Sequence, residues 1–446
     1  MVKKSKLPGD HCAPMKRVAI FTQFSSYSEA YSLNRVVMNQ IRMLVDNGYK
    51  PVVIVGQYFE PVLDYADPNV EIKRIPDVPV FNEVTQDPTF ETDVLAIEKA
   101  LALALEDVDV VLTHDIIYQP ACVKHLVAAK QIAKKRPDLR WLHWIHSATS
   151  PYTLSNLKPV FADKYADIIQ EKFPNSFYVF FNAYSIPRIA QNFQIGDEDV
   201  KVVHHPTDIK RFFKIEDSSW ELIQKKNILG SDVVCTYPIR LDRGKQVEKV
   251  IKTIASFKKL DKSVTLIIGD FHSTGGDKVD YRNECKKIAK DWKMTDDELI
   301  WLSEQKSDWN TEVPYAVISD FFHLSNVFVG ASVSESYSLI TQEAGLSGVG
   351  MILNRDFPPS RDIFGWGPHY IPFSSNINAL TGLDGDTQTR IENEEQFYLD
   401  AARVLNYELE HNRVLAMKTA LRKYRNLQYI FKHELEPLLY FEDAKR

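Results

Sequence analysis

The chain has 446 residues, 44% of them hydrophobic and 26% charged, a composition typical of a globular protein and unlike that of disordered or membrane-spanning chains. Because this length exceeds one ordinary core, we expect two large domains. The 54 basic and 60 acidic residues give a net charge of -6, which excludes a strong overall attraction to nucleic acid or anionic membranes.

The cysteines are scattered and form no C-x-x-C pair, a pattern typical of a reducing compartment: Cys12, Cys122, Cys235 and Cys285. The basic start MVKKSKLPGDHCAP precedes a short strand rather than an apolar signal region, so we expect no signal peptide. Charged residues interrupt every long apolar window, so we expect no membrane-spanning segment. These observations favour a cytoplasmic protein and leave its oligomeric state open.

The first half of the chain alternates strand-like and helix-like segments. The run RVAIFTQF from Arg17 is followed by helical spacing in LNRVVMNQIRMLVDNG and then by VVIV, a pattern typical of a strand buried on both faces. A helix is expected from Pro120 to Lys135, and further strands in DVDVVLTHD, LRWLHWIHS, SFYVFFNAYS and VKVVHHPTD. Such alternation favours a doubly wound α/β domain with ligands at the carboxyl ends of its strands.

Residues 209–230 carry no buried strand and are interpreted as a linker with one helix. The alternation then restarts with DVVCTYPIRLD, QVEKVIKTIASFKK, SVTLIIGDF, ELIWLSE, a helix near Tyr315 to Leu324, and NVFVGAS. From Glu394 onward the pattern is helical. We therefore expect an N-terminal Rossmann-like domain at 1–208, a second one at 209–415, and a helical segment at 416–446 that packs back on the first domain.

One stretch, from Phe328 to Ile352, carries the strongest chemical signal. An apolar run ends before Ser332, and a helix is expected to begin near Ser338. Glu335 and Glu343 bracket this junction in the pattern E-x7-E. The free N–H groups and the positive dipole end of a helix bind phosphate, and Glu343 would lie about a turn and a half further on, within reach of a sugar hydroxyl. The stretch therefore indicates a site for an activated, phosphate-bearing sugar.

These features resemble the retaining glycosyltransferases of the GT-B architecture, a group that includes glycogen and sucrose synthases and bacterial lipid and polysaccharide mannosyl- and glucosyltransferases. In that family the first Glu of E-x7-E contacts the donor sugar and the second holds the ribose, which implies these roles for Glu335 and Glu343. The turn that follows the first Glu matches the family's turn whose backbone N–H groups meet the diphosphate: Ser336, Tyr337, Ser338 and Leu339.

Further matches carry the resemblance, among them VKVVHHPTDIKRFF, which is similar to the family's segment at the domain junction. The run RLDRGK, from Arg240 to Lys245, is similar to the family's R-x4-K just after the first strand of the C-terminal domain. Two cations at a strand end can neutralise the diphosphate leaving group and replace a metal ion. In LHWIHSATS, His146 matches a strand-end His that faces the donor sugar.

The resemblance implies an α/β fold with two Rossmann-like domains facing a central cleft, with the acceptor on the N-terminal domain and the donor on the C-terminal one. It implies a metal-independent glycosyltransferase that uses a UDP- or GDP-sugar as co-substrate and no other cofactor. The implied catalytic residues are Arg240, Lys245, Glu335 and His146. However, Ser25 to Ser28 stand where many members have a glycine-rich loop. This departure keeps open a non-catalytic nucleotide-sugar-binding or scaffold protein on the same fold.

Two residue pairs imitate metal sites. His143 and His146 lie three apart on a strand and so point to opposite faces. Asp107 and Asp109 precede a strand, whereas the metal-binding D-x-D of the other glycosyltransferase architecture follows one. We therefore expect no metal site.

The acceptor stays open, because a saccharide, a lipid, a small metabolite and a modified DNA base all fit the resemblance. The basic stretches 130–140 and 286–293 are interpreted as helix surfaces, with an anionic acceptor such as DNA or lipid as the alternative. An epimerase or a phosphorylase with two Rossmann-like domains is disfavoured, because the chain has no pyridoxal-type lysine motif.

Overall fold

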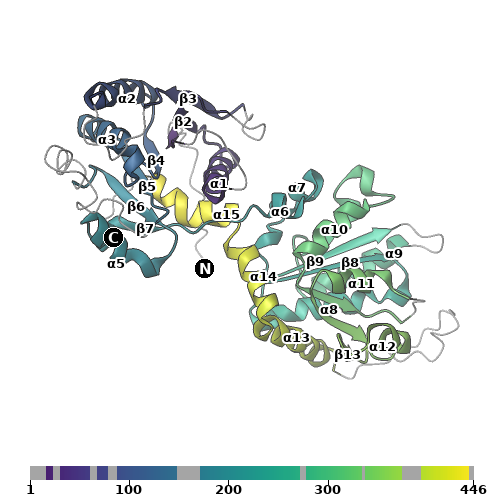
Figure 1. The fold of residues 1–446 in the computed structure, drawn as a ribbon. Helices are drawn as coiled ribbons and strands as arrows, with labels where there is room; N and C mark the ends of the chain where they lie inside the picture. The colour runs from purple at the N-terminus through teal and green to yellow at the C-terminus, as the bar shows by residue number, and fades with distance from the viewer. Residues whose placement is uncertain are drawn as a thin grey trace, which may run out of the picture. The chain divides into compact units, whose positions relative to one another are not determined.

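The computed structural model describes residues 17–23, 31–60, 68–78, 88–147, 171–271, 278–333, 337–373 and 393–440. The chain divides into two compact units: unit 1 comprises Met1–Pro206 with Leu427–Arg446, and unit 2 comprises Thr207–Asn426. Each unit contains one parallel sheet with helices packed on its faces (Figure 1).

The sheet of unit 1 has seven parallel strands in the order β3-β2-β1-β4-β5-β6-β7. Their bounds are β1 Val18–Phe21, β2 Val52–Gly56, β3 Glu71–Ile75, β4 Val110–His114, β5 Arg140–Trp144, β6 Ser176–Phe180 and β7 Val200–Val202. Alternate residues of β1 enter different apolar cores, with Ala19 and Phe21 in one and Val18 and Ile20 in the other. The central strands are therefore buried on both faces, which is why they consist of continuous apolar runs.

Helices α2, α3 and α5 cover one face of this sheet, and α1 covers the other together with the C-terminal helices (Figure 1). The bounds are α1 Ser32–Asp46, α2 Phe90–Ala104, α3 Val123–Lys135, α5 Ile186–Phe193, α15 Leu427–Ile430 and α16 Glu436–Leu439, with a π-helical turn at Phe431–Leu435. The α1 face is thus completed by residues from the far end of the chain.

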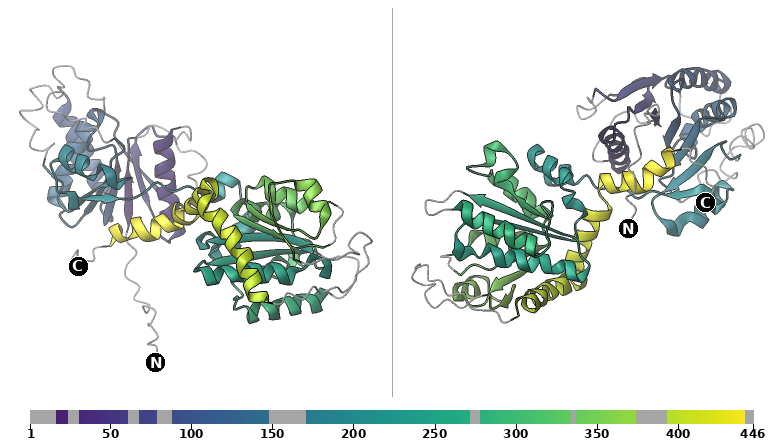
Figure 2. Two further views of the ribbon diagram at one scale, coloured as in Figure 1. Left: turned by 90° about the horizontal axis from the view of Figure 1, so that it is seen from below. Right: turned by 180° about the vertical axis from the view of Figure 1, so that it is seen from behind.

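The C-terminal helices run alongside the sheet of unit 1 (Figure 2). Polar contacts hold this segment there in addition to its apolar side chains. Arg140 donates hydrogen bonds to the carbonyl oxygens of Leu438 and Tyr440, at 3.0 and 2.6 Å. The backbone N–H of His204 donates to the Glu434 carboxylate at 2.7 Å, and the His204 ring contacts the same carboxylate at 3.0 Å. The expected return of the C-terminal helix onto the first domain is therefore observed, and it begins at Leu427.

The sheet of unit 2 has six parallel strands in the order β10-β9-β8-β11-β12-β13. The strand bounds are β8 Val233–Arg240, β9 Val264–Phe271, β10 Leu299–Trp301, β11 Val327–Gly330, β12 Gly350–Asn354 and β13 His369–Ile371. The helices are α6 Ile209–Phe213, α7 Asp217–Lys225, α8 Val247–Ser256, α9 Lys278–Asp291, α10 Tyr315–Leu324, α11 Leu339–Leu346, α12 Pro358–Phe364, α13 Glu394–His411 and α14 Arg413–Tyr424.

The expected α/β class with two Rossmann-like parallel sheets is confirmed. One local interpretation was wrong. Residues 209–230 hold two helices, α6 and α7, whose apolar residues, including Ile209 and Leu222, belong to the core of unit 2, so this stretch is not a linker. Strand β3 was not predicted either, because it is a partly exposed edge strand whose sequence, EIKRI, is rich in charged residues and lacks a continuous apolar run.

In the part of the chain that the structure describes, none of the helices combines the length and the hydropathy needed to cross a bilayer.

His125 on α3 is an unusual core residue of unit 1. Its ring is 3% exposed and lies 6.2 Å from the ring of Phe21. Neither ring nitrogen has a hydrogen-bond partner among the described residues. Burial, with a further contribution from the charge of Lys124, lowers the pKa of His125 to about 4. The folded protein therefore holds this imidazole neutral.

We expect His125→Phe to stabilise unit 1, increasingly so as the pH falls. Between pH 6.5 and about 4 the unfolded chain binds a proton at His125 that the folded chain does not. The free energy of unfolding of the wild type therefore decreases as the pH is lowered through this range. Phe keeps the ring and removes two unpaired polar atoms, for a gain of about 1 kcal/mol at pH 7. Denaturant unfolding at pH 7 and pH 5 measures both effects, with exposed His433→Phe as the control. A gain that is the same at both pH values would contradict the titration argument.

Candidate functional site

The strand order of unit 2 reverses between β8 and β11. From β8 the chain proceeds outward through β9 and β10, and from β11 it proceeds through β12 and β13 in the other direction. In open parallel sheets such a switch point leaves a crevice at the carboxyl ends of the two strands, where ligands bind. Both sequence motifs of this half follow these strands: RLDRGK begins at Arg240, the last residue of β8, and the E-x7-E stretch follows β11.

The two loops are joined by hydrogen bonds. The backbone N–H of Val333 donates to the carbonyl oxygen of Gly244 at 2.9 Å, and the Ser332 hydroxyl donates to the same oxygen at 3.3 Å. Asn354, at the end of β12, donates from its side-chain amide to the Ser332 carbonyl oxygen at 3.2 Å. The tertiary fold therefore brings the cationic loop after β8 against the beginning of the loop after β11.

Arg240 and Lys245 stand at the two ends of the cationic loop. The Arg240 side chain is 60% exposed, and its Nε lies 3.5 Å from a carboxylate oxygen of Asp242. Lys245 is only 8% exposed, and its carbonyl oxygen accepts a hydrogen bond from the Tyr237 hydroxyl at 2.9 Å. The loop thus presents one exposed and one largely buried cation near a single strand end.

Glu335 and Ser336 lie outside the described residues. The rest of the expected turn is described: Ser338 immediately precedes α11, which begins at Leu339 as predicted. Ser338 has φ of +73°, the left-handed region that costs a non-glycine residue about 1–2 kcal/mol. Its hydroxyl and that of Thr341 hydrogen-bond at 2.8 Å, while Tyr337 accepts a hydrogen bond from Gln342. Strained turns at helix starts are common at ligand sites.

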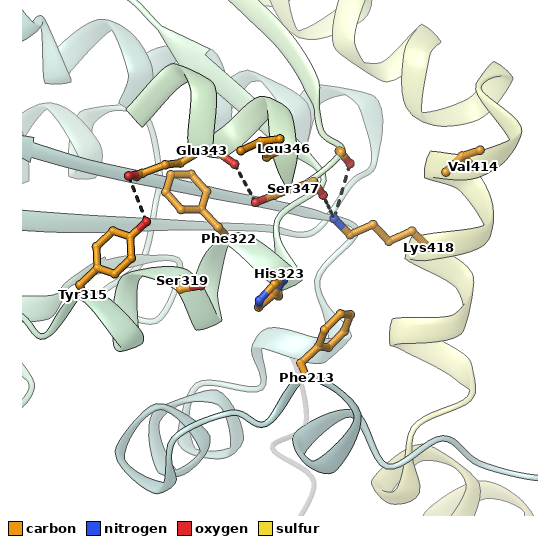
Figure 3. Close-up of a pocket in the computed structure, with 11 residues that line it drawn as sticks. Phe213, Tyr315, Ser319, Phe322, His323, Glu343, Leu346, Ser347, Val414 and Lys418 are labelled. Carbon is orange, nitrogen blue, oxygen red and sulfur yellow. Dashed lines mark hydrogen bonds between the residues drawn. The ribbon is translucent and has the colours of Figure 1, made fainter. Parts of the chain in front are cut away.

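Glu343 lines a pocket of about 450 Å³ between α10, α11 and α14 (Figure 3). The Tyr315 hydroxyl points at Glu343 and donates to its carboxylate at 3.1 Å, which raises the pKa of Tyr315 (Figure 3). A carboxylate has about four acceptor positions, so Glu343 can still accept a hydrogen bond from a ligand hydroxyl. Arg240 and Lys245 do not line this pocket. Neither cation thus contributes to the pocket of Glu343, which lies on the helix that follows the loop after β11.

In unit 1, the structure places His146 in a histidine cluster that the sequence analysis missed. His114 ends β4, and its Nδ1 lies 2.9 Å from Nε2 of His146, just beyond β5. His114 Nε2 lies 2.7 Å from the side-chain oxygen of Gln40 on α1. His205 stacks on His146, with ring centroids 6.1 Å apart and planes 10° apart. A signal was present in the sequence, because the runs DVVLTHD and LRWLHWIHS both place His at the end of a strand.

The histidines of this cluster are held neutral by burial. Desolvation lowers the pKa of His114 well below its usual value and that of His146 to about 3, with the neighbouring His205 as a further cause for both. Desolvation likewise lowers the pKa of His205. At neutral pH these rings therefore act as neutral hydrogen-bonding groups, each with one N–H and one lone pair.

His143, Asp107 and Asp109, whose spacing in the sequence resembles that of metal ligands, each contact another protein group. His143 is fully buried, and its ring hydrogen-bonds the Thr113 hydroxyl at 2.9 Å. Asp107 pairs with the Arg17 guanidinium at 3.3 Å, and Asp109 accepts a hydrogen bond from the Arg17 backbone at 3.0 Å. Within the described ranges, no group of three or more His, Cys, Asp or Glu side chains is arranged to hold a metal ion.

No protein-family model matches this chain. No curated protein matches it either.

Solved structures do match. A glycosyltransferase from Rickettsia africae ESF-5 is 12% identical, with 97% of this chain and 100% of that chain covered and a TM-score of 0.36. HepE from Anabaena in complex with UDP-glucose is 13% identical, with 95% and 99% covered and a TM-score of 0.33. A UDP-forming trehalose-phosphate synthase from Burkholderia xenovorans is 12% identical, with 96% and 100% covered and a TM-score of 0.36.

The chain is therefore similar to solved glycosyltransferases at low identity.

Asn354 is the residue that ties the loop after β11 to the sheet. It is 1% exposed, and besides donating to Ser332 it accepts hydrogen bonds from the backbone N–H groups of Asp356 and Phe373, at 3.2 and 3.1 Å. Its amide thus uses both its donor and its acceptor to hold three backbone segments together.

We expect Asn354→Asp to loosen the loop while unit 2 stays folded. The substitution keeps the acceptor oxygen but replaces the N–H that binds Ser332 with a second carboxylate oxygen, which repels the Ser332 carbonyl oxygen in a buried site, at a cost of about 3 kcal/mol in the free energy of unfolding. Denaturant unfolding measures the cost, and hydrogen exchange at the Val333 amide reports the loop. The matched control is Asn310→Asp on the surface. Unchanged stability together with unchanged exchange at Val333 would show that Asn354 does not hold the loop.

Proposed function

We propose that this chain is a retaining glycosyltransferase that moves a sugar from a nucleoside-diphosphate sugar to a hydroxyl acceptor. The observation that carries the proposal is the hydrogen bond from the Val333 N–H to the Gly244 carbonyl oxygen at the switch point of unit 2. It joins the loop of Arg240 and Lys245 to the loop that leads into α11. A pair of cations beside a helix start is an arrangement that suits a diphosphate.

In this proposal Arg240 and Lys245 stabilise the departing diphosphate without a metal ion. The backbone from Ser336 to Leu339 binds the diphosphate oxygens, and Glu335 orients the sugar. Glu343 accepts a hydrogen bond from a ribose hydroxyl, which the remaining acceptor positions of its carboxylate allow. The donor is a UDP- or GDP-sugar.

The transfer retains configuration at the sugar carbon. The bond from that carbon to the phosphate oxygen breaks, and a bond to the acceptor oxygen forms on the same face. The acceptor's proton passes to the departing phosphate oxygen, whose negative charge the two cations offset. We assign the acceptor to unit 1 and a substrate-hydroxyl contact to His146. The acceptor's class, including an anionic lipid or DNA, stays open.

We expect Lys245→Met and Arg240→Ala each to lower kcat for sugar transfer by about 100-fold or more, because each removes positive charge that is needed as the leaving group departs. Transfer of radiolabelled sugar measures this. Arg243→Ala is the matched control in the same loop, since Arg243 binds Glu284 at 2.9 Å and stacks on Tyr281. Normal turnover in the Lys245 and Arg240 variants would reject their roles.

We also expect one class of nucleotide sugar to raise the melting temperature. A ligand at about 100 times its Kd adds about 2.7 kcal/mol to the free energy of unfolding. UDP-, GDP- and ADP-sugars are compared by thermal shift, with Lys245→Met expected to reduce the response. Donor binding with neither sugar transfer nor donor hydrolysis would favour a non-catalytic nucleotide-sugar-binding protein. No response to any donor would contradict both functions.

A further inference from the structure

Three polar side chains of unit 1 form a hydrogen-bonded row. Gln40 on α1 is hydrogen-bonded to His114, and His114 is hydrogen-bonded to His146. Gln40 and His114 are almost completely buried, whereas His146 is partly exposed. The row therefore leads from the core below α1 to a histidine at the carboxyl edge of the sheet.

The row has a direction. In the orientation that the structure gives the Gln40 amide, its oxygen faces His114 and can only accept a hydrogen bond, so in this orientation His114 Nε2 carries the proton. A neutral His114 then has a lone pair on Nδ1, which accepts a hydrogen bond from Nε2 of His146. His146 is left with its own lone pair on Nδ1. No described residue hydrogen-bonds that atom.

The His146 ring is also held by its other contacts. Its backbone N–H donates to the Tyr118 hydroxyl at 3.0 Å, and Tyr118 in turn donates to Asp115. His205 stacks on its face, and the ring of Phe181 lies 4.9 Å from that of His205. The ring is thus fixed by an edge contact, a face contact and the backbone, so its Nδ1 lone pair has a defined direction.

We propose that His114 is a positioning residue that, together with Gln40, fixes His146 as the Nε2–H tautomer and makes Nδ1 an acceptor for a substrate hydroxyl. The tautomer is a property of unit 1 alone. The assignment of the bound group as a substrate hydroxyl rests on the proposed glycosyl transfer. The alternative is that His114 only fills the core, in which case its loss would change stability and leave the tautomer of His146 as it was.

The tautomer is tested by ¹⁵N NMR of the full-length protein labelled at histidine, with the His146 signals assigned by their loss in His146→Gln. We expect wild-type His146 to be protonated at Nε2. His114→Phe keeps an aromatic ring but removes the acceptor, so His146 should become a mixture of tautomers. His114→Asn offers an amide oxygen near the place of Nδ1 and should restore the Nε2–H form.

Two results would overturn the proposal: wild-type His146 protonated at Nδ1, or the same tautomer in wild type and His114→Phe. If His114→Phe does not fold, Gln40→Met provides the second variant. It removes the oxygen at the far end of the row without touching His146, and should produce the same mixture of tautomers. An unchanged tautomer there would also overturn the proposal.

Kinetics separate this inference from the proposed function. With a donor that the wild type uses, we expect His114→Phe to lower kcat about tenfold, which corresponds to one hydrogen bond, and His114→Asn to recover most of the loss. Equal kcat in all three proteins would overturn the positioning role. Absence of transfer by the wild type would reject the proposed function, while the NMR result would still decide the tautomer.

Discussion

The parallel pairing of β8 with β11 is the constraint on which the unit 2 site depends. These strands are not consecutive in the chain, and their pairing, with Val327 opposite Cys235, brings their carboxyl ends to the same edge of the sheet. Ser332 and Gly244 are 88 positions apart in the sequence, yet their loops are hydrogen-bonded. Without this pairing, the cations after β8 and the helix start after β11 would be unrelated features.

The loop after β11 is held from both sides. Gly244 accepts hydrogen bonds from Val333 and Ser332, and Asn354 binds the Ser332 carbonyl oxygen from β12. Beyond this fixed point the chain adopts the left-handed conformation of Ser338 before α11 begins. A residue other than glycine keeps such a conformation only when several surrounding contacts hold its backbone there.

Unit 1 uses burial to control the chemistry of its histidines. Desolvation lowers the pKa values of His114 and His146, so these rings stay neutral and hydrogen-bond to one another instead of repelling each other.

The face of the sheet formed with α1 is completed by the C-terminal helices, which Arg140 and Glu434 hold in place. Residues between Leu427 and Leu439 thus belong to the core of unit 1.

The sequence by itself determined the elements whose signal is local. Apolar runs such as VVIV predicted buried parallel strands, and the change of pattern near Ser338 predicted the start of α11, because period and capping are properties of neighbouring residues. Local pattern failed for β3 and for residues 209–230, where an edge position and contacts with a distant core decided the outcome. Only the tertiary structure decided that Tyr315 binds Glu343, that Val333 binds Gly244 and that His114 lies behind His146. Each of these contacts joins segments far apart in the chain, and strand order, which no local pattern encodes, brings them together.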